Sequence, residues 1–286
     1  MKKIKYLLPV LALLLFVQAD MPAYKLFNKE GKKAKFKNMI EDASKADVVF
    51  FGELHNNAIG HWLQLEVAKA LKEKSGKSLI LGAEMFESDQ QIILSEYLDG
   101  MVSSRNFESG THLWKNYSTD YKPLVDFAKD NNYPFIATNI PRRYASYVAK
   151  NGLDSLKLNL DKHSQLFIAP LPIAYDPELS GYKGMMHGGG MPGFPYLPQA
   201  QAIKDATMAH FINKNLKENS LFLHFNGAYH SQNFEGIVWY LKKYNPAIKI
   251  MTITTVEQDT IDSVKEDNLN TADYIIVVDG DMTKTY

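Results

Sequence analysis

Two motifs of the form Gly-x-x-His lie far apart in the sequence and could carry chemistry. The first runs from Gly52 to His55 and includes Glu53, and the second runs from Gly227 to His230. A glycine at the end of a strand permits a tight turn and the close approach of a ligand. Imidazole and carboxylate groups form a mixed N/O set that suits Mn, Co, Zn or Fe, and a glutamate can act as general base on metal-bound water. One such histidine would more often be structural, but the repeated form favours a functional site.

Glutamate and arginine side chains occur between the two motifs. Glu84 has apolar neighbours, so its carboxylate needs a partner or a raised pKa. Glu87 either joins the same site or is an ordinary residue of a first helical turn. Arg142, and less strongly Arg143, follow a proline that suits a helix start, where a guanidinium could hold a carboxylate bidentately. We predict catalytic roles for Glu53, Glu84 and Arg142, and metal ligation by His55, His230, Glu84 and Glu87.

These residues follow short apolar runs that are typical of buried strands, and the runs alternate with amphipathic patterns of helical period. This alternation predicts a single α/β domain, with a largely parallel sheet flanked by helices on both faces. The carboxyl ends of parallel strands share one edge of a sheet, where ligands bind, so we expect the polar residues to converge there. The predicted strands cover 47–52, 78–84, 134–138, 221–225, 249–254 and 274–279. The predicted helices cover 57–74, a stretch after Ser88, 123–129, a stretch opening at Pro141, 199–216, 231–244 and, more weakly, 256–264.

One stretch, 170–198, breaks the alternation. It holds six prolines and a run of three glycines, together with methionine, tyrosine and histidine side chains. A loop of this length within a compact domain is usually functional or disordered. Its soft and aromatic side chains, which include those of Tyr182 and His187, could form a flat surface for a ligand. The alternative is a Met-rich lid that fills its own apolar gap.

The composition excludes several classes of protein. The 286 residues include 32 basic and 32 acidic residues, 45% are hydrophobic, and none is cysteine. This is an ordinary globular composition, which argues against a disordered chain, and a chain without cysteine has no thiolate site and no disulfide. A balanced charge gives no cationic excess for binding nucleic acid, so we expect no nucleic-acid partner.

The first 19 residues have the pattern of a secretory signal peptide. Lys2, Lys3 and Lys5 precede a short apolar run and the small-residue pattern 17–19, which predicts cleavage before Asp20. Cleavage would leave 29 basic and 32 acidic residues and a net charge of −3. We therefore expect a periplasmic or secreted protein with its domain at 20–286, and not a lipoprotein, because there is no cysteine to carry the lipid. An uncleaved anchor helix is the alternative.

Taken in their order along the chain, these motifs resemble the ChaN-like haem-binding proteins of the Tiki/TraB/erythromycin-esterase superfamily. The mark of that family is a pair of Gly-x-x-His motifs near opposite ends of the domain, with glutamate and arginine between them. The resemblance covers about residues 40–280. The matching residues are Gly52–His55, Glu84, Glu87, the segment 139–142, Ala200, Gln201, Asp205, Met208, Ala209 and Gly227–His230.

The resemblance implies an α/β fold of the ChaN type, haem binding at a homodimer interface and a role in haem or iron uptake, with an outer-membrane uptake system as a possible partner. Arg142 or Arg143 would then pair with haem propionates, and Tyr144, Tyr182 and His187 are the candidate axial ligands of the haem iron. Other branches of the superfamily imply the alternative, a metal-dependent peptidase or esterase that uses the paired motifs with an ion such as Mn, Co or Zn. A third interpretation, an interaction module without a ligand, leaves the convergence of polar residues unexplained.

Overall fold

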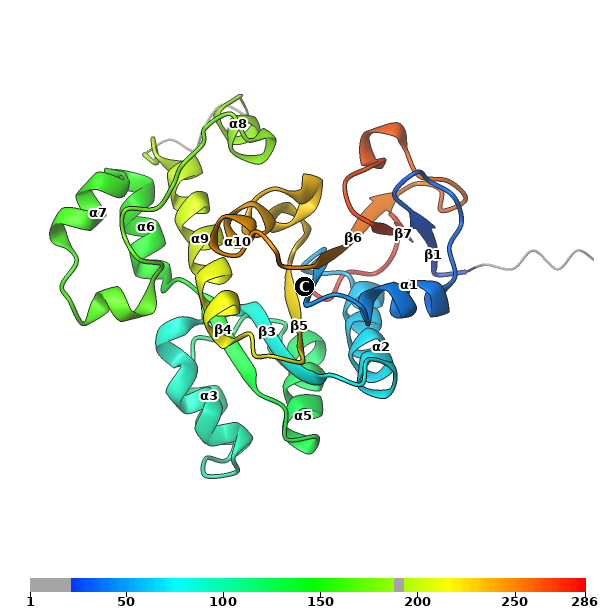
Figure 1. The fold of residues 1–286 in the computed structure, drawn as a ribbon, viewed down its shortest axis with the longest axis horizontal. Helices are drawn as coiled ribbons and strands as arrows, with labels where there is room; N and C mark the ends of the chain where they lie inside the picture. The colour runs from blue at the N-terminus through cyan, green and yellow to red at the C-terminus, as the bar shows by residue number, and fades with distance from the viewer. Residues whose placement is uncertain (1–21, 188–192) are drawn as a thin grey trace, which may run out of the picture.

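A seven-stranded sheet forms the centre of the protein in a computed structural model that describes residues 22–187 and 193–286 (Figure 1). The strand order is β1-β7-β6-β2-β5-β3-β4. β1 pairs antiparallel with β7, and all the other neighbouring strands are parallel, which confirms the predicted α/β class with a largely parallel sheet. The strands are β1 (Tyr24–Asn28), β2 (Val48–Glu53), β3 (Ser78–Glu87), β4 (Phe135–Asn139), β5 (Ser220–Gly227), β6 (Ile250–Gln258) and β7 (Tyr274–Asp279).

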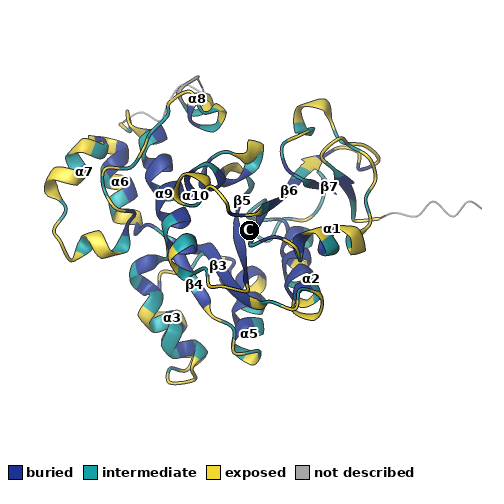
Figure 2. Ribbon diagram, in the orientation of Figure 1, coloured by how far each residue is buried: buried dark blue, intermediate teal, exposed yellow. Residues whose placement is uncertain are grey.

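Helices cover both faces of this sheet because its central strands are apolar on both sides (Figure 2). In β2, Phe51 faces a core shared with α1, α2 and α5, whereas Phe50 faces a second core shared with α9 and α10. Successive side chains of a strand point to opposite faces, so each apolar run supplies both cores. The helices are α1 (Phe36–Ala43), α2 (Ala58–Lys74), α3 (Gln91–Leu98), α4 (Ser104–Gly110), α5 (Lys122–Asp130), α6 (Arg142–Asn151), α7 (Leu153–Asn159), α8 (Ser180–His187), α9 (Leu197–Asn215) and α10 (Ile237–Tyr244).

Two predicted helices differ from the structure near the C-terminal end of the chain. The helix predicted at 256–264 is wrong, because β6 continues to Gln258. The side chain of Gln258 then forms hydrogen bonds with the backbone of Thr260, Ser263 and Lys265, which hold the following loop. The helix predicted at 231–244 begins only at Ile237. Three residues with positive φ, Asn233, Phe234 and Gly236, break the backbone before that point.

Other segments also differ between the prediction and the structure. β1 and α1 lie before or at the start of the expected core and were not predicted. The stretch 170–198 is only partly a loop, because α8 lies within it and α9 begins at Leu197. The predicted signal segment 1–19 lies outside the described residues. Among the residues that are described, no helix is long and apolar enough to cross a membrane.

β3 is longer than predicted, and this changes the position of Glu84. Pairing between β3 and β5 ends at Ala83, and the register of β3 with β4 shifts between Ala83 and Glu87. Glu84 therefore lies where the strand leaves its neighbours, so its carboxylate can reach the end of β5. Glu87, the last residue of β3, lies at the same edge of the sheet.

Candidate functional site

The first Gly-x-x-His motif forms a carboxylate–imidazole pair at the end of β2. Glu53 is 2% exposed, and its Oε1 lies 2.9 Å from Nδ1 of His55. The hydroxyl of Tyr121 donates to Oε1 at 2.6 Å, and the amide of Gln64 donates to Oε2. These contacts fix the carboxylate, which in turn orients the ring of His55. Burial alone would lower the pKa of His55, but Glu53 and Glu84 outweigh burial and raise it.

A turn of π-helix, Tyr117–Tyr121, supports this pair from the side. Such turns interrupt regular helices and are frequent at functional sites. Asn116, at its start, donates one hydrogen bond to the carbonyl of His55 at 2.8 Å and another to Asp120 at 2.6 Å. Thr285, near the end of the chain, also donates to Asp120 at 2.7 Å. The backbone around His55 is thus tied to two distant segments.

The second motif forms a closed cluster with Glu84 and Asp205. Nε2 of His230 lies 3.2 Å from Glu84, and Nδ1 is bonded to Asp205 on α9. The second oxygen of Glu84 accepts the backbone N–H of Gly227 at 2.8 Å. All three ionisable residues are at most 5% exposed. The structure therefore brings together residues from β3, α9 and the segment after β5.

Charge within this cluster favours a protonated imidazole. Burial would lower the pKa of His230, but Glu84 and Asp205 outweigh it and raise the pKa to about 10. Burial likewise disfavours the charged form of Glu84, yet His230 holds its pKa well below the usual range. Burial raises the pKa of Asp205. A protonated His230 can donate one N–H to Glu84 and the other to Asp205.

The predicted divalent metal site is not supported. Across the residues that the structure describes, no group of three or more His, Asp or Glu side chains is arranged to hold a metal ion. Of the four predicted ligands, His230 and Glu84 bind each other, and His55 is bound to Glu53. Glu87 instead lines a pocket at the edge of the sheet.

The stretch 170–198 contributes to the closed cluster through α8. Tyr182 is 2% exposed, and its hydroxyl donates to Asp205 at 2.7 Å. Glu235 accepts the backbone N–H groups of Ser180 and Gly181 at the start of α8. His187 is the last residue of α8, and its side chain lies outside the part of the chain that the structure describes. The hydroxyl of Tyr182, a predicted axial ligand, is thus already bound to a carboxylate of the protein.

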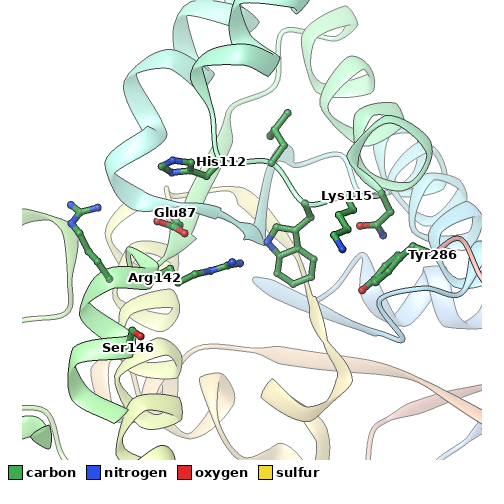
Figure 3. Close-up of a pocket in the computed structure, with 10 residues that line it drawn as sticks. Glu87, His112, Lys115, Arg142, Ser146 and Tyr286 are labelled. Atoms are coloured by element: carbon green, nitrogen blue, oxygen red, sulfur yellow. The ribbon is translucent and has the colours of Figure 1, made fainter. Parts of the chain in front are cut away.

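A pocket of about 760 Å³ lies at the carboxyl edge of the sheet, beside the end of β3 and the start of α6 (Figure 3). Trp114 is one of its lining residues, and the hydroxyl of Tyr286 points toward the interior (Figure 3). Among described residues, Arg142 and Lys115 have no ion-pair partner and Glu87 is the one acidic side chain in the lining. The pocket is lined by Glu87, His112, Leu113, Trp114, Lys115, Asn116, Arg142, Arg143, Ser146 and Tyr286.

The two adjacent arginines differ in whether they form an ion pair with another residue. Arg143 donates to Asp89 at 2.6 Å, and its guanidinium lies 4.5 Å from the ring centre of Tyr144. Arg142 is exposed and points into the pocket (Figure 3). Tyr144 is half-buried, accepts a hydrogen bond from Arg143 and is not part of the pocket lining. Of the two arginines, Arg142 is therefore the one without an ion-pair partner among the described residues.

In a comparison against protein-family models, residues 39–241 match the model described as "Haem-binding uptake, Tiki superfamily, ChaN". The chain belongs to this family. A curated relative of the ChaN-like chain is the chloroplastic protein RETICULATA-RELATED 5 of Arabidopsis thaliana, which is 24% identical over 194 residues. The match covers 62% of this chain but only 26% of that longer protein.

Solved structures share the ChaN-like fold. ChaN of Campylobacter jejuni, in a structure of cofacial haem binding, has a TM-score of 0.65 and 18% identity, over 89% of this chain and 96% of that one. A mutant of the erythromycin esterase EreC in its open conformation has a TM-score of 0.51 and 11% identity, over 88% and 94% of the two chains. A Bacillus cereus protein also has a TM-score of 0.51, with 12% identity over 90% and 95%.

Several residues of the site were not found from the sequence of this ChaN-like chain. His112, Trp114 and Lys115 lie in a connection between α4 and the π-helical turn, where the sequence has no hydrophobic periodicity to mark them. Tyr286 reaches the pocket from the far end of the chain. The one available signal was the density of aromatic and basic side chains in the segment 112–117.

Proposed function

We propose that this protein binds haem in the pocket around Trp114. The observation that carries the proposal is the combination of a large aromatic surface with two cations, Arg142 and Lys115, that have no ion-pair partner among the described residues. A volume of about 760 Å³ is in the range of cofactor pockets. A porphyrin face would pack on the indole, and the propionates would pair with the cations.

The donor groups of the pocket also suit haem. Bound haem supplies an iron that takes an axial nitrogen or oxygen ligand. His112 and Tyr286 line the pocket and form no side-chain hydrogen bond within the described part of the chain. The three candidates predicted from the sequence have other surroundings: the hydroxyls of Tyr144 and Tyr182 are bonded to protein groups, and the side chain of His187 is not described.

Titration with haemin tests this proposal. We expect a saturable Soret shift and quenching of tryptophan fluorescence, with weaker binding for Trp114→Ala and Arg142→Ala. Arg105→Ala is the matched control, because Arg105 is exposed on α4 outside the pocket. The absence of a saturable Soret change in the wild-type protein would remove the proposal.

The finer expectations, export and a haem-linked homodimer that serves iron uptake, belong to the same proposal. His112, Lys115, Arg142 and Tyr286 are exposed around the pocket, so a second copy could cover a bound porphyrin. Light scattering with and without haemin tests the dimer. N-terminal sequencing of protein recovered from the periplasm or medium tests export, with Asp20 as the expected first residue.

A second candidate function is hydrolysis without a metal ion. It is favoured by the Glu53–His55 pair, in which a buried carboxylate orients a ring that is 38% exposed. A carboxylate on Nδ1 leaves Nε2 as a general base that can accept a proton from water. Ester hydrolysis measured in the presence of a chelator tests this function, and His55→Gln should abolish it.

A further inference from the structure

The pocket and the Glu53–His55 pair share a wall. The rings of His55 and Trp114 meet edge to face, with their centres 4.9 Å apart. Asn116, which lines the pocket, donates to the carbonyl of His55 at 2.8 Å. A ligand in the pocket would therefore lie about one side chain away from the imidazole.

The same wall carries a polar atom that has no partner in the protein. Oδ1 of Asn116 is buried and accepts no hydrogen bond among the described residues, although the residue is only 3% exposed. A buried acceptor without a donor costs free energy, and because this oxygen is not accessible from the pocket, a ligand there can reach it only if the Asn116 side chain moves.

The ring of His55 packs directly against the backbone of Gly227. A Cβ atom on Gly227 would lie 2.7 Å from the ring of His55 and 3.5 Å from Glu84, closer to the ring than side chains normally approach. The ring can hold its orientation only because this position lacks a side chain. The second Gly-x-x-His motif thus shapes the surroundings of the first.

The charge of the pocket selects the sign of a ligand. Arg143 is already paired with Asp89, so the charges that remain for a ligand are those of Arg142 and Lys115, opposed by Glu87. Two unpaired cations against one carboxylate favour an anionic ligand. A guanidinium binds a carboxylate through two parallel hydrogen bonds, which makes Arg142 the better anchor.

We propose that the pocket and the Glu53–His55 pair form one hydrolytic site for esters whose acyl chain ends in a carboxylate. The free carboxylate binds Arg142 and Lys115. His55 accepts a proton from water as the water oxygen bonds to the acyl carbon. The bond from that carbon to the leaving oxygen then breaks, and the proton goes to the leaving alcohol. The products are a dicarboxylate and an alcohol. This proposal rests on the second candidate function above.

A pair of esters of matched length tests the substrate class. Mono-p-nitrophenyl adipate carries the terminal carboxylate, and p-nitrophenyl hexanoate lacks it. Hydrogen bonds to a charged group contribute about 1.5–3 kcal/mol, so we expect kcat/KM to be roughly 10- to 100-fold higher for the adipate ester. Equal kcat/KM values for the two esters would overturn the proposal while leaving hydrolysis itself intact.

Variants separate the anchor from the base. Arg142→Ala should lower kcat/KM about tenfold more for the adipate ester than for the hexanoate ester, Arg142→Lys should restore part of that difference, and Arg105→Ala should change neither activity. An equal loss on both esters in Arg142→Ala would overturn the proposal. His55→Gln should abolish both activities. Hydrolysis of neither ester by the wild type, or full activity in His55→Gln, would overturn the hydrolase function as well, whereas haemin binding reports on the pocket independently.

Discussion

Two polar regions lie at the same edge of the sheet, and they differ in how their side chains are used. Around His230, every charged group is buried and bonded to another protein group. Around Trp114, the cations Arg142 and Lys115 are exposed and have no ion-pair partner within the described residues. A site that satisfies its own charges stabilises the fold, whereas a site with unused charges is suited to a ligand. The predicted metal ligands are thus divided between the two regions: His230 and Glu84 lie in the closed cluster, whereas Glu87 lines the open pocket.

Loss of His230 gives the largest effect expected from this comparison. His230→Ala leaves Glu84 and Asp205 as buried carboxylates without their shared cation, which should reduce the free energy of unfolding by about 3–5 kcal/mol. Urea denaturation followed by circular dichroism measures it. His112→Ala, a change in the open pocket, should stay within about 0.5 kcal/mol of the wild type. Similar losses in both variants would mean that the two regions are not distinct.

Two buried histidines should give opposite pH dependences. Burial lowers the pKa of His224 to about 4, so the unfolded chain takes up its proton first and stability is lost as pH falls from about 6.5 toward 4. The pKa of His230 is raised to about 10, so its contribution is complete below about 6.5 and is lost as pH rises toward 10. The His224 effect is at most roughly 3 kcal/mol.

Urea unfolding between about pH 4.5 and 10 checks both signs. His224→Gln should flatten the acidic limb, and His230→Gln should flatten the alkaline limb. If the free energy of unfolding falls at high pH in His230→Gln as it does in the wild type, the assignment of a positive charge to His230 would be contradicted.

The open pocket should respond in ligand affinity rather than in stability. Replacing Arg142 by alanine removes a charge-assisted bond worth about 1.5–3 kcal/mol, so the Kd for haemin should rise roughly 10- to 100-fold. The midpoint of urea unfolding should not change. Arg143→Ala is a useful second comparison, because its guanidinium is already bound to Asp89 and we expect a smaller loss. An effect of Arg143→Ala as large as that of Arg142→Ala would remove the distinction between the two.

The sequence predicts the framework of both regions but not their separation. Glu84 was identifiable because a carboxylate among apolar neighbours requires a partner, and Gly227–His230 because it repeats the form of the first motif. The contact between Asp205 and His230 was not accessible from the sequence, because it depends on how α9 packs against β4 and α10. Hydrophobic periodicity reports which face of an element is buried and carries no information on which polar side chains meet.

The errors in the fold prediction have a similar local cause. In the segment 250–258, β-branched residues favour a strand, and this preference extends β6 beyond the predicted end at residue 254. The spacing of the apolar residues in 256–264 favoured a helix, but the structure has no α-helix in this segment. Trp114 was missed because it lies in a connection without periodicity, where no pattern marks a side chain that faces a ligand.

The smallest predicted effect concerns Tyr182, which the sequence placed in the haem site and the structure places beside Asp205. Tyr182→Phe removes one donor from that carboxylate and should cost about 1 kcal/mol of unfolding free energy, with no change in the haemin spectrum or Kd. Tyr175→Phe is the matched control, because Tyr175 packs against Tyr182 and its hydroxyl has no hydrogen bond among the described residues. A shifted Soret band in Tyr182→Phe, with the spectrum of Tyr175→Phe unchanged, would bring α8 back into the ligand site and would show that the closed cluster and the open pocket act together.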